Sequence, residues 1–141
     1  MHVYQRTFEG QVEQLRAIRE FVEDSVIGLG ANEEDAFACQ LAADEAATNA
    51  FKHAYAGSPG RLEIVVWREA DRIALRLRNW GASFDPDAIP VPDITRPLYE
   101  RPAGGLGIFL MRKFMDEVHF NFDPREGNTV TMQRRLNPGV D

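Results

Sequence analysis

The sequence predicts one α/β domain, and three observations lead to this prediction. Apolar residues recur at helical steps in three stretches of the chain and alternate with polar residues, as in strands, in four others. A chain of 141 residues is long enough for one domain with a core and too short for two ordinary ones. Hydrophobic residues make up 44% and charged residues 27% of the chain, which is the balance of a soluble globular protein.

Each predicted helix is marked by an apolar stripe or by a start signal. The first runs from Gln11 to about Ile27, and glycines at positions 28 and 30 are placed to end it. The second runs from about Glu33 to about Ala54, because Asn32 can cap its start and acidic residues fill its first turn. The apolar stripes of the first and third helices consist of Val12, Leu15, Ile18, Val22 and Val26, and of Ile108, Met111, Met115 and Val118.

The predicted strands form two pairs of sequence neighbours. Residues 62–67 and 73–77 alternate with a period of two around a short turn at residues 70–71, so they predict a hairpin. Two further strands, "VHFNF" and "TVTMQR", are joined by "DPREGN" near the end of the chain. Between Asn79 and Gly104 there are five prolines and no sustained periodicity. This segment predicts a long loop, and long loops in compact domains are usually functional or mobile.

Composition and charge exclude several classes of protein. The net charge of −6 leaves no broad basic surface for a phosphate backbone, so no direct nucleic-acid partner is predicted. No apolar run approaches the roughly 20 residues that span a bilayer, and the first residues lack a signal-peptide pattern. These features predict a cytoplasmic protein without a membrane partner. Cys39 is the only cysteine, and its apolar neighbours predict a buried thiol rather than a nucleophile.

The stretch "LAADEAATNAFKHAY" (41–55) combines a stripe of small residues with a polar rim on one predicted helix. Glu45, Asn49 and His53 follow one another at four-residue steps along the rim. A carboxylate and an amide oxygen one turn apart can serve as a base for a proton and as a ligand for a hard divalent cation. From this helix alone, a solvated polar face explains the rim at least as well. The stripe consists of Ala43, Ala46, Ala47, Ala50 and Ala54.

Two further motifs flank the proline-rich loop. In "NWGASFDP" (79–86), Asn79 ends a strand and Gly81 permits a tight turn or the close approach of a ligand, although an ordinary turn has the same pattern. In "AGGLGIF" (103–109), glycines precede a helix and leave backbone N–H groups free to face an anion. This second motif is not a P-loop, because no Lys-Ser/Thr follows it, and it lacks the third glycine of a dinucleotide fingerprint.

The order of these motifs resembles the nucleotide site of the GHKL ATPase and kinase superfamily, which includes gyrase and sensor histidine kinases. The strings "DEAATNAFKHAY", "FDP", "GGLGIFLMRKFMDEV" and "GNTVTM" are more closely similar to the anti-sigma-factor serine/threonine kinases of bacterial partner-switching systems. The likeness extends from Gln11 to Arg135. It implies a Bergerat-type ATP-binding fold, an α+β two-layer sandwich in which three helices cover one face of a mixed β-sheet. It also implies a single domain over residues 1–141, with a lid loop at about 85–104.

The same resemblance implies a reaction. ATP and Mg²⁺ would bind between the long second helix and the lid, and the γ-phosphoryl group would pass to a serine or threonine hydroxyl of a protein partner. Glu45 would be the general base, Asn49 would hold Mg²⁺ at the phosphates, and His53 would have at most a positioning role.

The resemblance also assigns contacts to the nucleotide. Gly81 would lie under the adenine, and Asn79 stands where the family usually has an aspartate that accepts a hydrogen bond from the adenine amino group. Gly105 and Gly107 would present N–H groups to the phosphates, and Arg101 would contact the γ-phosphate. The remaining implied nucleotide-binding positions are Phe84, Gly104, Leu106, Ile108 and Thr129.

Several functional alternatives stay open at this stage. The partner implied by the resemblance is an antagonist of an anti-sigma factor, a sigma factor, or both, and a homodimer is also open. A regulatory module that docks without catalysis is favoured by Asn79, which lacks the charge of the usual aspartate. A detached histidine-kinase catalytic domain is a third candidate, but none of the three histidines lies in an obvious phosphoacceptor helix. A wholly structural role for the motifs leaves their shared order unexplained.

Overall fold

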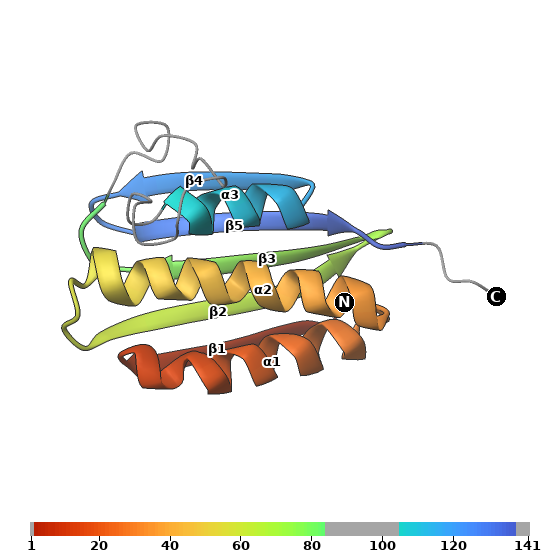
Figure 1. The fold of residues 1–141 in the computed structure, drawn as a ribbon, viewed down its shortest axis with the longest axis horizontal. Helices are drawn as coiled ribbons and strands as arrows, with labels where there is room; N and C mark the ends of the chain where they lie inside the picture. Colours follow the sequence, from red (N-terminus) through yellow and green to blue (C-terminus); the bar gives the residue numbers. More distant parts are fainter. Residues whose placement is uncertain (1, 84–104, 138–141) are drawn as a thin grey trace.

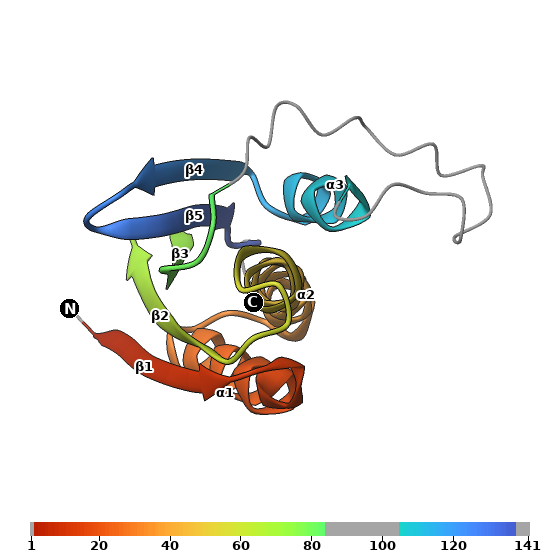
Figure 2. The ribbon, with the colours of Figure 1, turned by 90° about the vertical axis from the view of Figure 1, so that its left-hand side faces the viewer.

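A computed structural model describes residues 2–83 and 105–137 of the chain. This part holds a five-stranded β-sheet and three α-helices, which cover one face of the sheet (Figure 1, Figure 2). The predicted two-layer α+β sandwich is therefore confirmed. The strands are β1 (Val3–Gly10), β2 (Gly60–Glu69), β3 (Arg72–Asn79), β4 (Glu117–Asp123) and β5 (Gly127–Arg135). The helices are α1 (Leu15–Gly28), α2 (Glu33–Asn49) and α3 (Gly105–Phe114), with a 3₁₀ turn at Val12–Gln14 and a π-helix at Ala50–Ala54.

The sheet is antiparallel throughout, which corrects the expectation of a mixed sheet. The strand order is β1-β2-β3-β5-β4, and every neighbouring pair is antiparallel. β3 and β4 run in the same direction, but β5 lies between them and pairs with both. The final hairpin thus inserts its second strand between the two strands that could have formed a parallel pair.

Helix α2 lies between α1 and α3 (Figure 1). Ala43 and Ala47 are fully buried, and the other alanines of the predicted stripe are at most 8% exposed. Small side chains let the helix axis come close to the apolar residues of β3 and β5, the strands that α2 contacts. The stripe is therefore the packing face of α2, and the polar rim beside it is turned toward α3. Cys39 on the same helix is buried, and burial raises the pKa of its thiol to about 12, so it is not a nucleophile at neutral pH.

The boundaries of the elements differ from the sequence predictions in four places. The first helix, expected from Gln11, begins at Leu15, because a separate 3₁₀ turn occupies Val12–Gln14. β1 is a strand that the residue pattern did not predict. The π-helix at Ala50–Ala54 ends the long second helix, which was expected to be regular to about that point. Val118, expected in the stripe of the third helix, belongs to β4, because α3 ends at Phe114. The predicted lid at residues 85–104 lies outside the described residues, so it stays a prediction.

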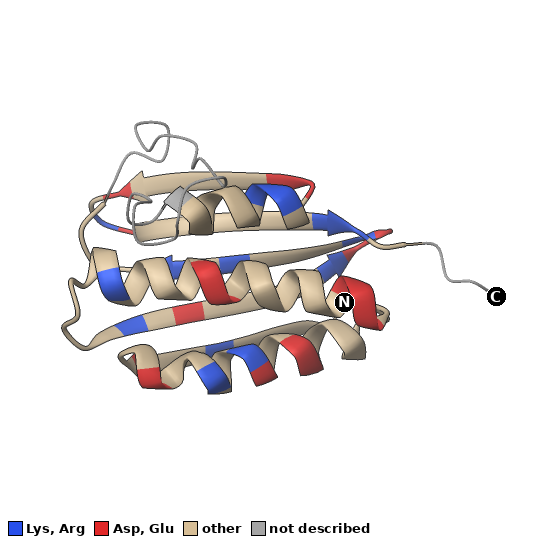
Figure 3. Ribbon diagram, in the orientation of Figure 1, with Lys and Arg blue, Asp and Glu red and all other residues tan. Residues whose placement is uncertain are grey.

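Basic and acidic residues are interspersed along the helices and strands (Figure 3). Arg16 and Glu20 form an ion pair one turn apart on α1, and Arg19 reaches Asp44 of α2 at 2.9 Å. Such exposed pairs contribute at most about 1 kcal/mol each, so burial of apolar surface supplies most of the stability of the helix layer. In the described part of the chain, no helix is both long and apolar enough to cross a membrane.

Candidate functional site

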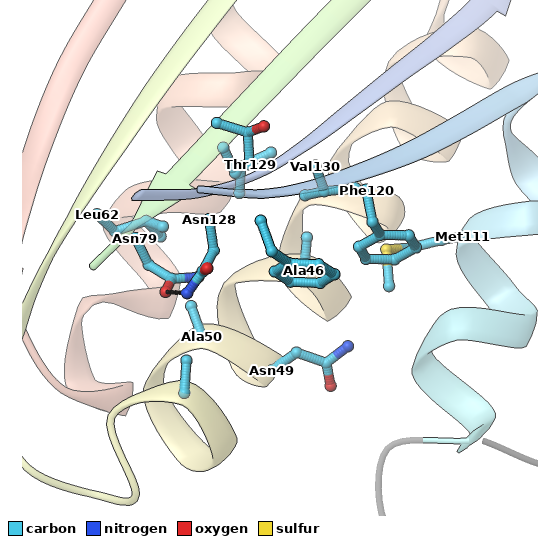
Figure 4. A pocket seen from close by; sticks show the side chains of 13 residues that line it. Ala46, Asn49, Ala50, Leu62, Asn79, Met111, Phe120, Asn128, Thr129 and Val130 are labelled. Atoms are coloured by element: carbon cyan, nitrogen blue, oxygen red, sulfur yellow. Dashed lines mark hydrogen bonds between the residues drawn. The ribbon is translucent and has the colours of Figure 1, made fainter. Parts of the chain in front are cut away.

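A pocket opens between α2 and the neighbouring ends of β3, β4 and β5 (Figure 4). Most of its lining is apolar, and the alanines of α2 and of the π-helix form one side. The polar groups of the lining come from Asn49, Asn79, Asn128 and Thr129. Pockets that bind small organic molecules are typically apolar with a few placed polar groups, and this lining has that composition. Three residues predicted to bind the nucleotide, Asn49, Asn79 and Thr129, therefore line one pocket.

The first turn of α3 lies directly against the polar rim of α2. A side chain on Gly107 would begin 2.9 Å from Glu45 Oε2 and 3.6 Å from Asn49 Oδ1, so the α3 backbone lies close to both side chains and a larger residue here would displace the Glu45 carboxylate. The first N–H groups of a helix have no partner within the helix and attract anions. The structure thus brings a carboxylate, an amide and a helix start suited to an anion into one small region beside the pocket.

Asn49 is suited to hold a divalent cation together with a phosphate ligand. Among the described residues, no group of three or more His, Cys, Asp and Glu side chains could hold a metal ion. Mg²⁺ usually keeps several waters and binds through one or two protein oxygens plus the phosphates of its substrate. The amide oxygen of Asn49, next to the start of α3, fits such an arrangement, in which the phosphates supply the remaining oxygen ligands.

The carboxyl group of Glu45 has a raised pKa. Partial burial raises the pKa from its ordinary value of 4.5, the negative charge of Asp44 raises it further, and the positive charge of Lys52 lowers it. A raised pKa makes a carboxylate a stronger base, and proton transfer is most efficient when the pKa of the base approaches the working pH. The environment of Glu45 therefore favours a role in accepting a proton.

Replacing Glu45 by glutamine is expected to raise the thermal stability of the protein at neutral pH. The folded carboxyl has a higher pKa than the unfolded one, so the folded state loses stability as the pH rises from 4.5 through the raised pKa. Glutamine carries no such group. The Tm of Glu45→Gln should therefore exceed that of wild type above this pH range, and the two Tm values should converge below it. Calorimetry across a pH series measures both. Glu34→Gln, at an exposed position of α2, is the control and should give no such increase.

The end of β3 is held by a closed set of hydrogen bonds. Gly81 N–H donates to Asn79 Oδ1 at 3.0 Å, and Asn128 Nδ2 donates both to Asn79 Oδ1 at 3.1 Å and to the Gly81 carbonyl oxygen at 2.9 Å. Gly81 packs against the carbonyl of Ala54, where any side chain would collide with the backbone of the π-helix. Ala82 N–H donates to that same carbonyl at 2.8 Å. Close packing against the end of the helix therefore requires a glycine at position 81.

Asn128 lies within the string "GNTVTM", but it was not among the predicted site residues. It is the cross-strand partner of Asn79, and only 8% of it is exposed. Its place in the pocket follows from the pairing of β3 with β5, which are separated in the chain by α3 and β4. No local pattern around position 128 carries that information.

The other predicted site residues do not gather around the pocket. His53 is exposed on the π-helix, outside the pocket lining, whereas Ile108 is buried in the hydrophobic core. Leu106 is half-buried on α3, and Gly105 is the first residue of that helix. Phe84, Arg101 and Gly104 lie outside the described residues, so their roles stay predictions.

Known proteins resemble this chain in sequence and in fold. The profile of the histidine kinase-like ATPase domain matches residues 8–134. Serine-protein kinase RsbW of Bacillus cereus is 33% identical over 101 residues, which are 69% of this chain and 62% of that protein. The protein of the same name from Bacillus mycoides is 32% identical over the same lengths. The matched region thus spans less than two thirds of these relatives.

A solved structure containing the RsbU and RsbW domains of Rv1364c from Mycobacterium tuberculosis has a TM-score of 0.70 to this chain at 18% sequence identity. The match covers 98% of this chain and 34% of the other, and it shows a shared fold. The family profile covers nearly the whole chain, from β1 to β5. This chain therefore belongs to the histidine kinase-like ATPase domain family.

Proposed function

We propose that this protein is an ATP-binding serine/threonine kinase of the anti-sigma-factor type, which regulates a protein partner by phosphoryl transfer and by docking. The observation that carries the proposal is the approach of α3 to the rim of α2, where Glu45, Asn49 and Gly107 meet. The name serine-protein kinase, borne by relatives 33% identical over 101 residues, supports the choice of substrate hydroxyl. The partner would be an antagonist of an anti-sigma factor, a sigma factor, or both.

Each part of the site has a role in this reaction. The apolar pocket receives the adenine, and the first N–H groups of α3, which a helix cannot pair internally, hold the phosphates. Asn49 would hold Mg²⁺, which neutralises charge on the phosphate oxygens when bound. The serine or threonine oxygen of the partner bonds to the γ-phosphorus, the bond from that phosphorus to the oxygen bridging to the β-phosphate breaks, and ADP leaves. Glu45 takes the hydroxyl proton, and positioning supplies most of the rate enhancement.

Removal of the Asn49 side chain is expected to weaken the dependence of ATP binding on Mg²⁺. Wild-type protein should bind ATP more tightly with Mg²⁺ than without it, and Asn49→Ala should reduce this difference by about tenfold or more, since residues around a metal commonly matter by 10–100-fold. Calorimetric titration of both proteins, with Mg²⁺ and with EDTA, measures the four affinities. Asn49→Asp keeps an oxygen ligand and is the matched variant that should retain the dependence.

Two results would count against this assignment. If wild-type protein gives no heat and no thermal shift with millimolar ATP in either condition, the proposed nucleotide site is wrong. If Asn49→Ala keeps the full Mg²⁺ dependence while remaining folded, another group holds the ion.

A docking module without catalysis is the second candidate, and the hydrogen bonds of Asn79 favour it. The oxygen of this amide already accepts two hydrogen bonds from the protein, so position 79 offers the base neither a charge nor a free acceptor. Incubation with labelled ATP, Mg²⁺ and purified candidate partners separates the two functions. A labelled phosphoserine or phosphothreonine supports the kinase, whereas a stable complex without transfer supports the docking module.

A further inference from the structure

The two asparagines on the pocket wall have orientations that the backbone determines. The N–H of Gly81 can only donate, so the amide atom of Asn79 that lies 3.0 Å from it is the oxygen. The carbonyl of Gly81 can only accept, so the amide atom of Asn128 that lies 2.9 Å from it is the nitrogen. Turning over either amide would place two donors or two acceptors against each other.

These hydrogen bonds use one end of each amide completely. Asn79 Oδ1 accepts two hydrogen bonds and Asn128 Nδ2 donates two, which is the full capacity of each atom. The opposite ends, Asn79 Nδ2 and Asn128 Oδ1, have no hydrogen-bond partner among the described residues. Among the described residues, the side-chain atoms that are fully buried and lack a hydrogen-bond partner belong to two arginines of β3. Asn79 Nδ2 and Asn128 Oδ1 are not fully buried, so both keep some contact with solvent.

The pair therefore presents one donor and one acceptor at the edge of the pocket. Both residues belong to its lining, and Figure 4 shows their side chains bonded to each other there. Because Asn128 is 8% exposed, its free oxygen has little access to water and gains from a ligand donor. Adjacent donor and acceptor groups match the two neighbouring polar positions on the six-membered-ring edge of a purine.

We propose that Asn128 and Asn79 together select the base of the nucleotide. Asn128 Oδ1 accepts a hydrogen bond from the exocyclic amino group of adenine, and Asn79 Nδ2 donates to the adjacent ring nitrogen N1. The acceptor role that the family resemblance gives to position 79 thus passes to Asn128, because the Asn79 oxygen is already engaged. In the same pose, a 6-oxo purine would place an acceptor against Asn128 Oδ1 and an N–H donor against Asn79 Nδ2. This inference rests on the proposed binding of ATP.

Comparison of ATP with inosine triphosphate tests the proposal, since inosine carries an oxo group at position 6 and a hydrogen on N1. The full chain with Mg²⁺ should bind inosine triphosphate about tenfold more weakly than ATP, or weaker still, because both contacts are mismatched. Asn128→Ala should weaken ATP binding by a similar factor and reduce the ratio of the two affinities, because only the contact of Asn79 with N1 then discriminates between the two bases. Asn121→Ala removes an exposed asparagine of β4 outside the pocket and should keep the wild-type ratio.

The outcomes separate this inference from the proposed function. A purely structural role of Asn128 would lower both affinities equally and keep their ratio, and this result would overturn the inference. Equal affinities of the wild-type protein for the two triphosphates would overturn it as well, even if Asn128→Ala failed to fold, while ATP binding itself would stand. If neither triphosphate binds, the proposed function fails and the inference fails with it.

Discussion

Glu45→Gln is expected to slow phosphoryl transfer to the protein partner by roughly 10²–10⁴-fold, the usual contribution of general base catalysis. Glutamine keeps the shape and the hydrogen bonding of the side chain that faces Gly107, but it cannot take the proton of the attacking hydroxyl. ATP affinity should change little, because the carboxylate is assigned to the hydroxyl and not to the nucleotide. Single-turnover transfer from labelled ATP measures the rate, and calorimetry measures the affinity.

Asp44→Asn provides the matched control for this experiment. Asp44 is the adjacent carboxylate on α2, but it pairs with Arg19 of α1 at 2.9 Å instead of facing α3. Its replacement removes one negative charge from the same helix and should have a much smaller effect on the rate. Equal rates for Glu45→Gln and wild type would show that another group is the base. If wild type binds ATP and phosphorylates none of the partners, the docking function replaces the kinase.

The features that the sequence predicted correctly are those that depend on local order. Asn32 caps α2 as expected, since its side chain accepts a hydrogen bond from Asp35 N–H at 2.8 Å. The alanine stripe and the rim of Glu45 and Asn49 follow from the helical repeat alone. The β2–β3 hairpin follows from two alternating segments around a short turn.

The features that were missed depend on pairing between distant segments. β1 is an edge strand with one buried residue, Phe8, and with Arg6 stacked over the Phe8 ring, so its alternation of apolar and polar residues is weak. Its hydrogen bonds come from β2, which lies beyond two helices in the sequence. The insertion of β5 between β3 and β4, which makes the sheet antiparallel, is equally non-local.

Contacts between distant segments also explain why parts of the site could not be predicted from the sequence. The four-residue spacing placed Glu45 and Asn49 on one rim, but it could not show that Gly107 of another helix would lie against both. Asn79 was identified as a departure from the family pattern. The sequence alone could not show that the Asn79 oxygen accepts hydrogen bonds from Gly81 and Asn128, because this depends on how β3 and β5 are paired.

Asp35→Ala is expected to destabilise the protein by about 3–5 kcal/mol, the usual effect of removing one partner of a buried ion pair. Asp35 is 1% exposed and accepts hydrogen bonds from Arg134 Nε at 2.8 Å and from Asn137 N–H at 3.0 Å. Arg134 also donates to the carbonyl of Phe114 at the end of α3, so this ion pair joins the start of α2, the end of β5 and the end of α3. Alanine would leave the arginine charge and one backbone N–H without these partners. Urea denaturation of the variant and wild type measures the loss.

Two further measurements test the ion pair: a control at Glu34 measures the general effect of an acidic residue near the start of a helix, and a double-mutant cycle measures the coupling between Asp35 and Arg134. Glu34 is exposed in the same first turn, and Glu34→Ala should cost no more than about 1 kcal/mol, the contribution of a charge to the helix dipole. The double variant Asp35→Leu/Arg134→Met removes both charges and should be less destabilised than the sum of its single variants, because neither leaves an unpaired charge in the interior. Additive losses would mean that the two side chains are not energetically coupled, and the 2.8 Å contact would then contribute little to the stability that holds the three elements together.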